Sequence, residues 1–266
     1  DPRVKFDIMK WDPIALLPRS AMIYSRPELG LKGLSPKAQL AKMASLPKDA
    51  LVMGGKTPTS TDINYRAAFS LMGIELKNVW GMKGNGPMAL AFERGEFTLM
   101  YDNCLSYLNN RKSFRDEGLS VELFTFGAPD VNGKWKDKNG KWNRDAVWPN
   151  VPSYFEYYEA ATGKKFTGAA AEATMKLTKI GVNVNKAYLL QGGTSAPVLK
   201  AWRGAFKKAM ADPDFIKRKD RIIGPYAVTI GEAAGAVMKQ NFSLTNGEKA
   251  YFRKYLKTRY NLDLKI

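Results

Sequence analysis

Between residues 51 and 126, short apolar runs alternate with polar or glycine-containing loops and with amphipathic stretches of helical period. The runs at 51–53, 76–80, 97–101 and 119–126 predict strands, and the stretches after the first three predict helices. Because strands that alternate with helices usually lie parallel in one sheet, the pattern predicts an α/β fold with a mainly parallel sheet. Ahead of it, residues 14–24 predict an extended, partly buried segment.

The C-terminal third predicts helices. Pro197 is placed for the first turn of a helix whose apolar residues recur at helical spacing. Thr229-x-x-Glu232 and Thr245-x-x-Glu248 both have the capping-box pattern, so we expect a helix to begin at each.

Residues 131–143 interrupt the alternation of strands and helices. They contain Asn139-Gly140, a strong signal for a two-residue hairpin turn, and the tripeptide Gly-Lys-Trp occurs in them twice. The sequence predicts an exposed β-hairpin with Trp135 and Trp142 paired across it. A second interpretation is an aromatic and basic patch that contacts nucleic acid or a partner.

The composition removes most enzyme chemistry from this chain. It has no histidine, which excludes Ser-His and Cys-His nucleophiles and His-ligated metals within it. Its one cysteine, Cys104, excludes an internal disulfide and a cysteine-rich metal site. We therefore expect neither an enzyme nor a bound cofactor or metal.

The net charge of +17, from 42 Lys and Arg against 25 Asp and Glu, is the strongest compositional bias. The basic residues are spread along the chain, without an arginine-rich block or a zinc-finger spacing. The favoured interpretation is a solvated basic surface without a specific partner. The functional alternatives are attraction to small anions, lipid headgroups or nucleic acid, and nucleic acid is not the partner we expect.

The loop 54–62 (GGKTPTSTD) is the first candidate for a binding site. It joins an apolar strand to a helix, whose first backbone N–H groups lack partners within the helix and carry a partial positive charge. Side-chain donors add to these groups: Lys56, Thr57, Thr59, Ser60 and Thr61. The loop suits an anion although it lacks the Walker A pattern; alternatively, its hydroxyls only cap the helix.

A second candidate is the polar pair Asp102 and Asn103, at the end of the strand predicted at 97–101. Polar residues at the carboxyl ends of parallel strands lie at the crevice where α/β sheets bind ligands. The alternative is that one of the two caps the following helix.

In their order and spacing, several segments resemble the substrate-binding proteins of tripartite tricarboxylate transporters, the Bug receptors of the bacterial periplasm. The match includes residues 1–17 (DPRVKFDIMKWDPIALL), the long segment 51–108, and within it a glycine turn at 84–87 followed by Ala89-Leu90 and Glu93-Arg94-Gly95-Glu96. Residues 147–159 and 190–215 complete it, the latter with GGTSAP before a helix and DPDF after it.

The resemblance implies a periplasmic-binding-protein-like Venus flytrap, with two lobes of mainly parallel sheet flanked by helices. It implies an extracytoplasmic receptor that captures a small organic carboxylate between the lobes and delivers it to an integral-membrane permease. The second lobe's half of the clamp would be Lys56, Thr57, Thr59, Ser60 and Thr61, with Asp102 and Asn103 on the cleft floor. Hinge motion would close the lobes on the ligand.

The family's first strand and glycine-rich loop have no counterpart here, so we expect the first lobe to be incomplete. Residues 1–15 and 205–266 would be its remainder, and residues 16–204 the second lobe, with the hairpin 131–143 inserted. The chain starts at Asp1, so either a periplasmic signal peptide has been removed or the sequence is truncated. The alternative function is a structural or interaction subunit of the same fold, bound to a larger assembly through its basic surface and the Trp135/Trp142 hairpin.

Overall fold

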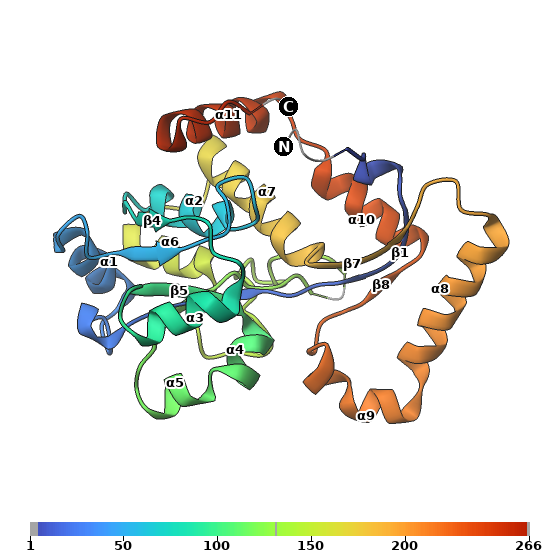
Figure 1. Cartoon of the computed structure of the whole chain (residues 1–266), viewed down its shortest axis with the longest axis horizontal. Helices are drawn as coiled ribbons and strands as arrows, with labels where there is room; N and C mark the ends of the chain where they lie inside the picture. The colour runs from blue at the N-terminus through green and yellow to red at the C-terminus, as the bar shows by residue number, and fades with distance from the viewer. Residues whose placement is uncertain (1–4, 131, 265–266) are drawn as a thin grey trace.

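The computed structural model describes residues 5–130 and 132–264, in which the strands form two sheets (Figure 1). The large sheet has the strand order β4-β3-β5-β2-β6, and the small sheet has the order β7-β1-β8. The strands of the large sheet are β2 (Ala21–Ser25), β3 (Val52–Gly54), β4 (Lys77–Val79), β5 (Leu99–Asn103) and β6 (Val121–Thr125). Those of the small sheet are β1 (Asp12–Leu17), β7 (Lys186–Leu190) and β8 (Thr229–Ile230).

The predicted α/β class is confirmed, but the strand directions are mixed rather than mainly parallel. In the large sheet β3 pairs parallel with β4 and β5, whereas β2 pairs antiparallel with β5 and β6. The small sheet is antiparallel throughout. The physical reason is that parallel pairing was predicted from the alternation of strands and helices, and β2 lies ahead of that alternation: it follows β1 of the other sheet with no helix between them. The extended segment predicted at 14–24 is therefore two strands in two sheets.

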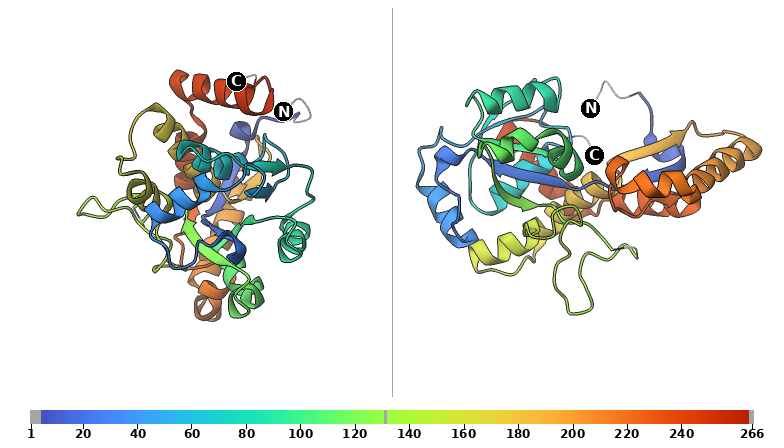
Figure 2. Two further views of the ribbon diagram at one scale, coloured as in Figure 1. Left: turned by 90° about the vertical axis from the view of Figure 1, so that its left-hand side faces the viewer. Right: turned by 90° about the horizontal axis from the view of Figure 1, so that it is seen from below.

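Seven helices of the described part accompany the large sheet (Figures 1 and 2). Helix α1 packs on α6, α2 packs on α7, and α3 and α4 contact strand β5. Their bounds are α1 (Pro36–Ser45), α2 (Ile63–Leu71), α3 (Asn85–Glu93), α4 (Cys104–Asn110), α5 (Lys112–Asp116), α6 (Tyr154–Thr162) and α7 (Ala169–Asn183). Short 3-10 helices lie at Ile8–Lys10 and Pro27–Leu29.

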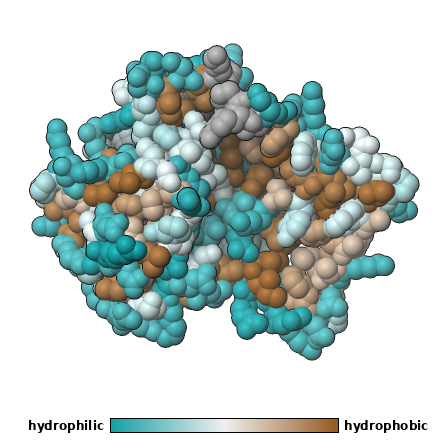
Figure 3. All heavy atoms as spheres, viewed as in Figure 1, coloured by the Kyte–Doolittle hydropathy of each residue, from teal (hydrophilic) through white to brown (hydrophobic). Residues whose placement is uncertain are grey.

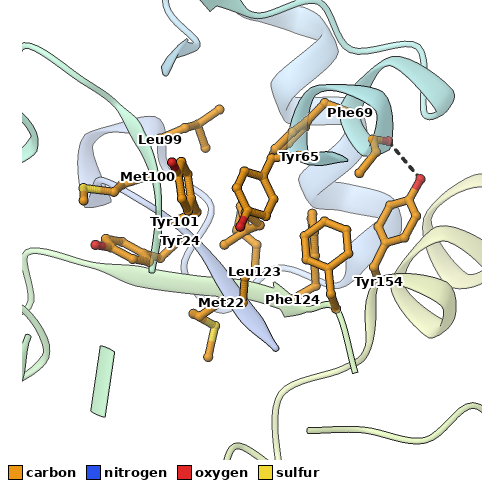
Figure 4. Close-up of a cluster of buried hydrophobic side chains, with 14 of the residues drawn as sticks. Met22, Tyr24, Tyr65, Phe69, Leu99, Met100, Tyr101, Leu123, Phe124 and Tyr154 are labelled. Atoms are coloured by element: carbon orange, nitrogen blue, oxygen red, sulfur yellow. Dashed lines mark hydrogen bonds between the residues drawn. The ribbon is translucent and has the colours of Figure 1, made fainter. Parts of the chain in front are cut away.

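The core under the large sheet is rich in aromatic side chains (Figure 4). Phe124 lies at its centre, with ring centroids 5.3 Å from Tyr154 and 5.8 Å from Phe69. The hydroxyl of Tyr154 donates a hydrogen bond of 2.9 Å to the carbonyl of Ala68, which satisfies a polar group that burial would otherwise leave without a partner.

Alternating residues of β1 hold helices on both faces of the small sheet. Ala15 and Leu17 belong to a cluster with residues of α8 (Ala196–Ala211) and α9 (Pro213–Ile222). Leu16 points the other way and packs with Ala234 and Met238 of α10 (Glu232–Phe242). This is the period-2 alternation expected of a strand.

The last helix, α11 (Asn246–Tyr260), returns to the large-sheet side of the molecule and packs on α7. It begins with the predicted capping box of Thr245 and Glu248. The other predicted box is wrong, because Thr229 lies in strand β8 and Gly231 is the N-cap of α10. The division into lobes, 1–15 with 205–266 against 16–204, stays a prediction.

The hairpin segment differs from its prediction in the position of its tryptophans; Val131 lies outside the described residues. Trp135 is only 8% exposed, and its ring meets Phe155 of α6 edge-on at 5.9 Å. Trp142 stacks on the same phenylalanine at 4.6 Å. The prediction of an exposed tryptophan pair is therefore wrong: the two rings anchor the loop on α6, because the apolar surface offered by that helix covers them better than they cover one another. Figure 2 shows this loop projecting from the body of the molecule.

No side chain of helix α8 is fully buried, although Phe206 and Met210 pack partly buried against the small sheet. Its apolar residues Val198 and Trp202 are exposed, as are Ile216 and Ile222 on α9. Figure 3 shows apolar surface continuing over this part of the small-sheet side. An exposed apolar surface of this kind is typical of a face that another chain or segment covers.

Candidate functional site

The predicted binding residues gather at one edge of the large sheet, where the parallel strands β3, β4 and β5 end. Two glycines let the loop after β3 lie against its neighbours. A Cβ atom on Gly54 would be 2.2 Å from Cε2 of Phe97, and one on Gly55 would be 2.5 Å from Cζ3 of Trp80. Only glycine therefore fits this close approach without rearrangement of both rings.

Lys56 and Asp62 form the polar centre of the loop. The carboxylate of Asp62 accepts from the backbone N of Lys56 at 2.6 Å, from its Nζ at 2.8 Å and from the Tyr101 hydroxyl at 2.5 Å. Asp62 is fully buried, whereas the Lys56 side chain is 36% exposed. Burial raises the pKa of Asp62, but the hydrogen bonds from Lys56 and Tyr101 outweigh it and leave that pKa below its usual value. The ammonium predicted as an anion donor is thus already paired.

The loop hydroxyls divide into those used internally and those that face outward. Ser60 Oγ donates to the carbonyl of Thr57 at 2.8 Å and accepts from the backbone N of Asp62 at 3.3 Å. The hydroxyls of Thr57 and Thr59 lie 3.3 Å apart, and Thr59 and Thr61 are exposed. Donors that remain available to a ligand are therefore found on the threonines rather than on Ser60.

The start of helix α2 offers fewer backbone donors than the sequence predicted. The N–H groups of Ile63 and Asn64 donate to the carbonyls of Ser60 and Thr61 at 3.2 and 3.1 Å. No loop hydroxyl caps this helix, since its N-cap residue is Asp62 and makes no side-chain cap bond. The alternative that the hydroxyls serve only as caps is therefore wrong.

Arg66 of helix α2, which sequence reasoning missed, holds the loop from beneath. Its Nη2 donates to the carbonyls of Met53 and Gly54 at 3.1 and 2.7 Å, and its Nε donates to Asn78 Oδ1 at 2.9 Å. The guanidinium lies 4.6 Å from the centroid of the Trp80 ring. Burial lowers the pKa of this arginine, and these partners compensate the buried cation without a direct carboxylate bond.

Asp102 lies at the predicted edge but inside the protein. It is 2% exposed, and it accepts hydrogen bonds from Tyr24 at 2.8 Å, Asn85 at 3.1 Å and Arg111 at 3.0 Å. Burial raises its pKa, and the Arg111 charge opposes that rise. The structure thus gives Asp102 internal partners: it ties the start of α3 and the end of α4 to strand β5.

The exposed Thr61 lines a narrow hollow that sequence reasoning did not find, and Asn103 contacts another of its lining residues, Asn185. Asn103 Oδ1 is 3.5 Å from Asn185 Nδ2. The hollow has a volume of about 10 Å³, and its polar lining includes Arg19, Thr61, Asn64 and Asn185. A space of this size accommodates about one water molecule.

Arg19 is a cation beside that hollow, on the connection between β1 and β2. Its Nη2 donates to the carbonyl of Ile222 at 3.2 Å, and its Nε is buried with no hydrogen-bond partner among residues 5–130 and 132–264. An unsatisfied buried donor is costly, so this guanidinium is suited to an added acceptor. The signal in the sequence was weak, because Arg19 stands alone after an apolar strand.

Within residues 5–130 and 132–264 there is no group of three or more acidic, cysteine or histidine side chains placed to hold a metal ion. No helix there has the length and apolar character needed to cross a membrane.

Several solved structures of other proteins share this architecture. A TctC solute-binding protein from Polaromonas superposes with a TM-score of 0.54 at 18% identity, over 90% of this chain and 68% of that one. MatC from Rhodopseudomonas palustris, solved with bound malate, gives 0.57 at 17% identity, over 90% and 68% of the two chains. A structure described as a periplasmic transporter gives 0.59 at 16% identity, over 96% and 72%.

This chain has the fold of the TctC-type solute-binding proteins. The fold predicted from the sequence resemblance is therefore confirmed. No protein-family model matches the sequence, and no curated protein matches it either. In these three neighbours roughly a third of the chain has no counterpart here.

Proposed function

We propose that the chain is an extracytoplasmic solute receptor, not an enzyme, that takes a small organic carboxylate between its two sheets. The observation that carries the proposal is the fold shared with a TctC solute-binding protein and with MatC, which was solved with a bound dicarboxylate, malate. The absence of histidine from the sequence agrees with it, because ligand capture needs no proton transfer. The basic net charge favours an anionic ligand as well.

We place the ligand against the exposed face of the loop after β3; the hollow beside it has room for about one water molecule and not for the ligand. Thr57, Thr59 and Thr61 would donate hydroxyl hydrogen bonds, and Arg19 would donate from the β1–β2 connection. Lys56 would contribute through the face it leaves exposed, since Asp62 already neutralises most of its charge. Ser60, Asp102 and Asn103 would shape the site from behind, in keeping with their internal contacts.

The two sheets are the natural lobes of such a receptor, and the connections between them would act as the hinge. Delivery to an integral-membrane permease in the periplasm follows from the proposed class of protein. The position of the C-terminal helix against α7 suggests that residues 246–260 move with the large sheet rather than with the small one.

Thermal denaturation in the presence of malate, adipate and citrate tests the proposal. A ligand at a hundred times its Kd adds about 2.7 kcal/mol to the free energy of unfolding. For a chain of this size we expect the Tm to rise by roughly 5 °C. The substitution Thr61→Val should reduce the shift, whereas Thr258→Val, at an exposed position on α11, should leave it unchanged.

If no carboxylate moves the Tm, the receptor proposal fails. The exposed apolar surface of α8 and α9 would then favour the second candidate, an interaction subunit that another protein covers. Size-exclusion chromatography with light scattering would show whether that face associates with a second copy.

A further inference from the structure

A second hollow lies away from the threonine loop, between the hairpin segment 132–143, helix α7 and the start of α11. Its volume is about 350 Å³, which falls in the range of small-molecule sites, roughly 300–1,000 Å³. It is lined by Trp142, Phe166, Ala171, Glu172, Met175, Lys176, Lys179 and Glu248. None of these residues belongs to the predicted carboxylate clamp.

One side of this hollow is apolar and held in place. The rings of Trp142 and Phe166 meet edge-on at 5.9 Å, and Met175 packs against the same core. Phe155 stacks on the Trp142 indole at 4.6 Å, which fixes the orientation of that ring. A rigid aromatic wall beside a thioether suits the flat or aliphatic body of a small molecule.

The other side carries two lysines in different states. Lys176 Nζ donates to the carbonyls of Gln240 and Ser243 at 3.2 and 3.0 Å and lies 3.9 Å from Glu248 Oε1. Lys179 makes no side-chain hydrogen bond or ion pair within the ranges that the structure describes. Burial, followed by repulsion from Lys176, lowers the pKa of Lys179. An anion placed beside Lys179 would relieve both effects.

Of the two glutamates in the lining, Glu248 has internal partners and Glu172 lies at the exposed rim. Glu248 Oε2 accepts from the backbone N of Thr245 at 2.7 Å as part of the capping box of α11. Glu172 is exposed in the first turn of α7, where the helix dipole favours a negative charge. Lys136 adds further positive charge, with its Nζ 4.0 Å from the centroid of the Trp142 ring. The Glu248 charge opposes the lowering of the Lys179 pKa, but burial and Lys176 outweigh it, and Lys179 forms no direct ion pair within the described residues.

We propose that this hollow binds an organic anion with an apolar body, its carboxylate meeting Lys179 and its body lying on Trp142 and Phe166. This second site is separate from the threonine loop and does not depend on the receptor function. In this proposal the hairpin segment has a function: it supplies the indole of Trp142 and the nearby Lys136, while helix α7 supplies Lys179.

Isothermal titration of the full chain with phenylacetate tests this site, with 2-phenylethanol as the uncharged probe of similar shape. We expect phenylacetate to bind at least tenfold more tightly than the alcohol, since charge-assisted contacts with a half-buried lysine account for that difference. Lys179→Met should lower the affinity for phenylacetate about tenfold or more, and Lys179→Arg should retain most of it. Lys207→Met, at an exposed position on α8, is the matched loss of charge and should have no effect.

The proposal is overturned if the alcohol binds as tightly as the acid, or if Lys179→Met binds phenylacetate like the unchanged protein. Equal losses of phenylacetate affinity in Lys179→Met and Lys207→Met would also overturn it, because they would indicate that the anion is attracted by the net charge of the protein alone. Far-ultraviolet circular dichroism of each variant checks folding, and Lys179→Gln replaces Lys179→Met if the latter does not fold.

Discussion

At the scale of single residues, Asp62 supports the loop on which the proposed receptor site depends. Asp62→Asn removes the charge that accepts from Lys56 and Tyr101. We expect the free energy of unfolding at pH 7 to fall by about 2 kcal/mol, because hydrogen bonds to charged groups are worth about 1.5–3 kcal/mol. Urea denaturation measures the difference, and Asp49→Asn, at an exposed surface ion pair, is the matched control with little expected effect.

The pH dependence of that difference follows from the pKa of Asp62. Because its folded pKa lies below its usual value, the stabilisation is present above the unfolded pKa and is lost as pH falls through the folded pKa. The gap between the protein and Asp62→Asn should therefore narrow below about pH 4. A gap that stays constant from pH 7 to pH 3 would contradict this assignment.

The limits of sequence reasoning are visible at the same residues. The loop and its donor types could be predicted, because a strand, a polar run and a helix are local features. The partners could not, since Tyr101 is 39 residues from Asp62 and Tyr24 is 78 residues from Asp102. For the same reason Lys56 was predicted as an available cation, Asp102 as a cleft residue, and Arg19 and Arg66 were not considered.

At the scale of elements, the hairpin segment is held to α6 by its tryptophans. Trp135→Ala should cost about 3 kcal/mol of unfolding free energy, because it leaves a cavity against Phe155. Trp202→Ala on α8 is the control, since that side chain is 50% exposed, and should cost less than 1 kcal/mol. Equal losses in urea denaturation would show that the loop is not anchored as described.

Element boundaries set by local chemistry were predictable, and those set by tertiary pairing were not. The capping box at Thr245 is confirmed because Thr245 and Glu248 bond within one turn. Thr229 has the same spacing to Glu232, yet it pairs with Leu16 of β1 instead. The two tryptophans likewise pack against helix α6 and not against each other. No pattern inside residues 131–143 could indicate this contact, because the helix lies outside the segment.

At the scale of the whole molecule, the two sheets were predicted only in part. The strand–helix alternation gave the α/β class, but it could not reveal that residues 12–25 run through both sheets. That passage makes β2 antiparallel to its neighbours and puts Arg19 on the connection between the sheets. Because this passage links the two sheets, single side chains can alter the contacts between the small-sheet side and the large-sheet side.

Tyr226 provides one such contact, from the connection between α9 and β8 to the large-sheet side. Its hydroxyl donates at 2.7 Å to the fully buried carboxylate of Asp145. Burial raises the pKa of Asp145, and the Tyr226 hydrogen bond opposes that rise. Tyr226→Phe should therefore raise the pKa of Asp145 in the folded protein further, and the Asp145 carboxyl would stay protonated up to a higher pH. The stability lost should be largest above the folded pKa and should shrink as pH falls through it.

We expect Tyr226→Phe to lower the free energy of unfolding by about 2 kcal/mol at pH 7.5 and by less at pH 4.5. Urea denaturation at both pH values measures this, and Tyr188→Phe, at a half-exposed position on β7, is the control. Equal losses at the two pH values would mean that Tyr226 does not act through the Asp145 charge. If the connections between the sheets act as the proposed hinge, removal of this bond should also increase the radius of gyration in small-angle scattering.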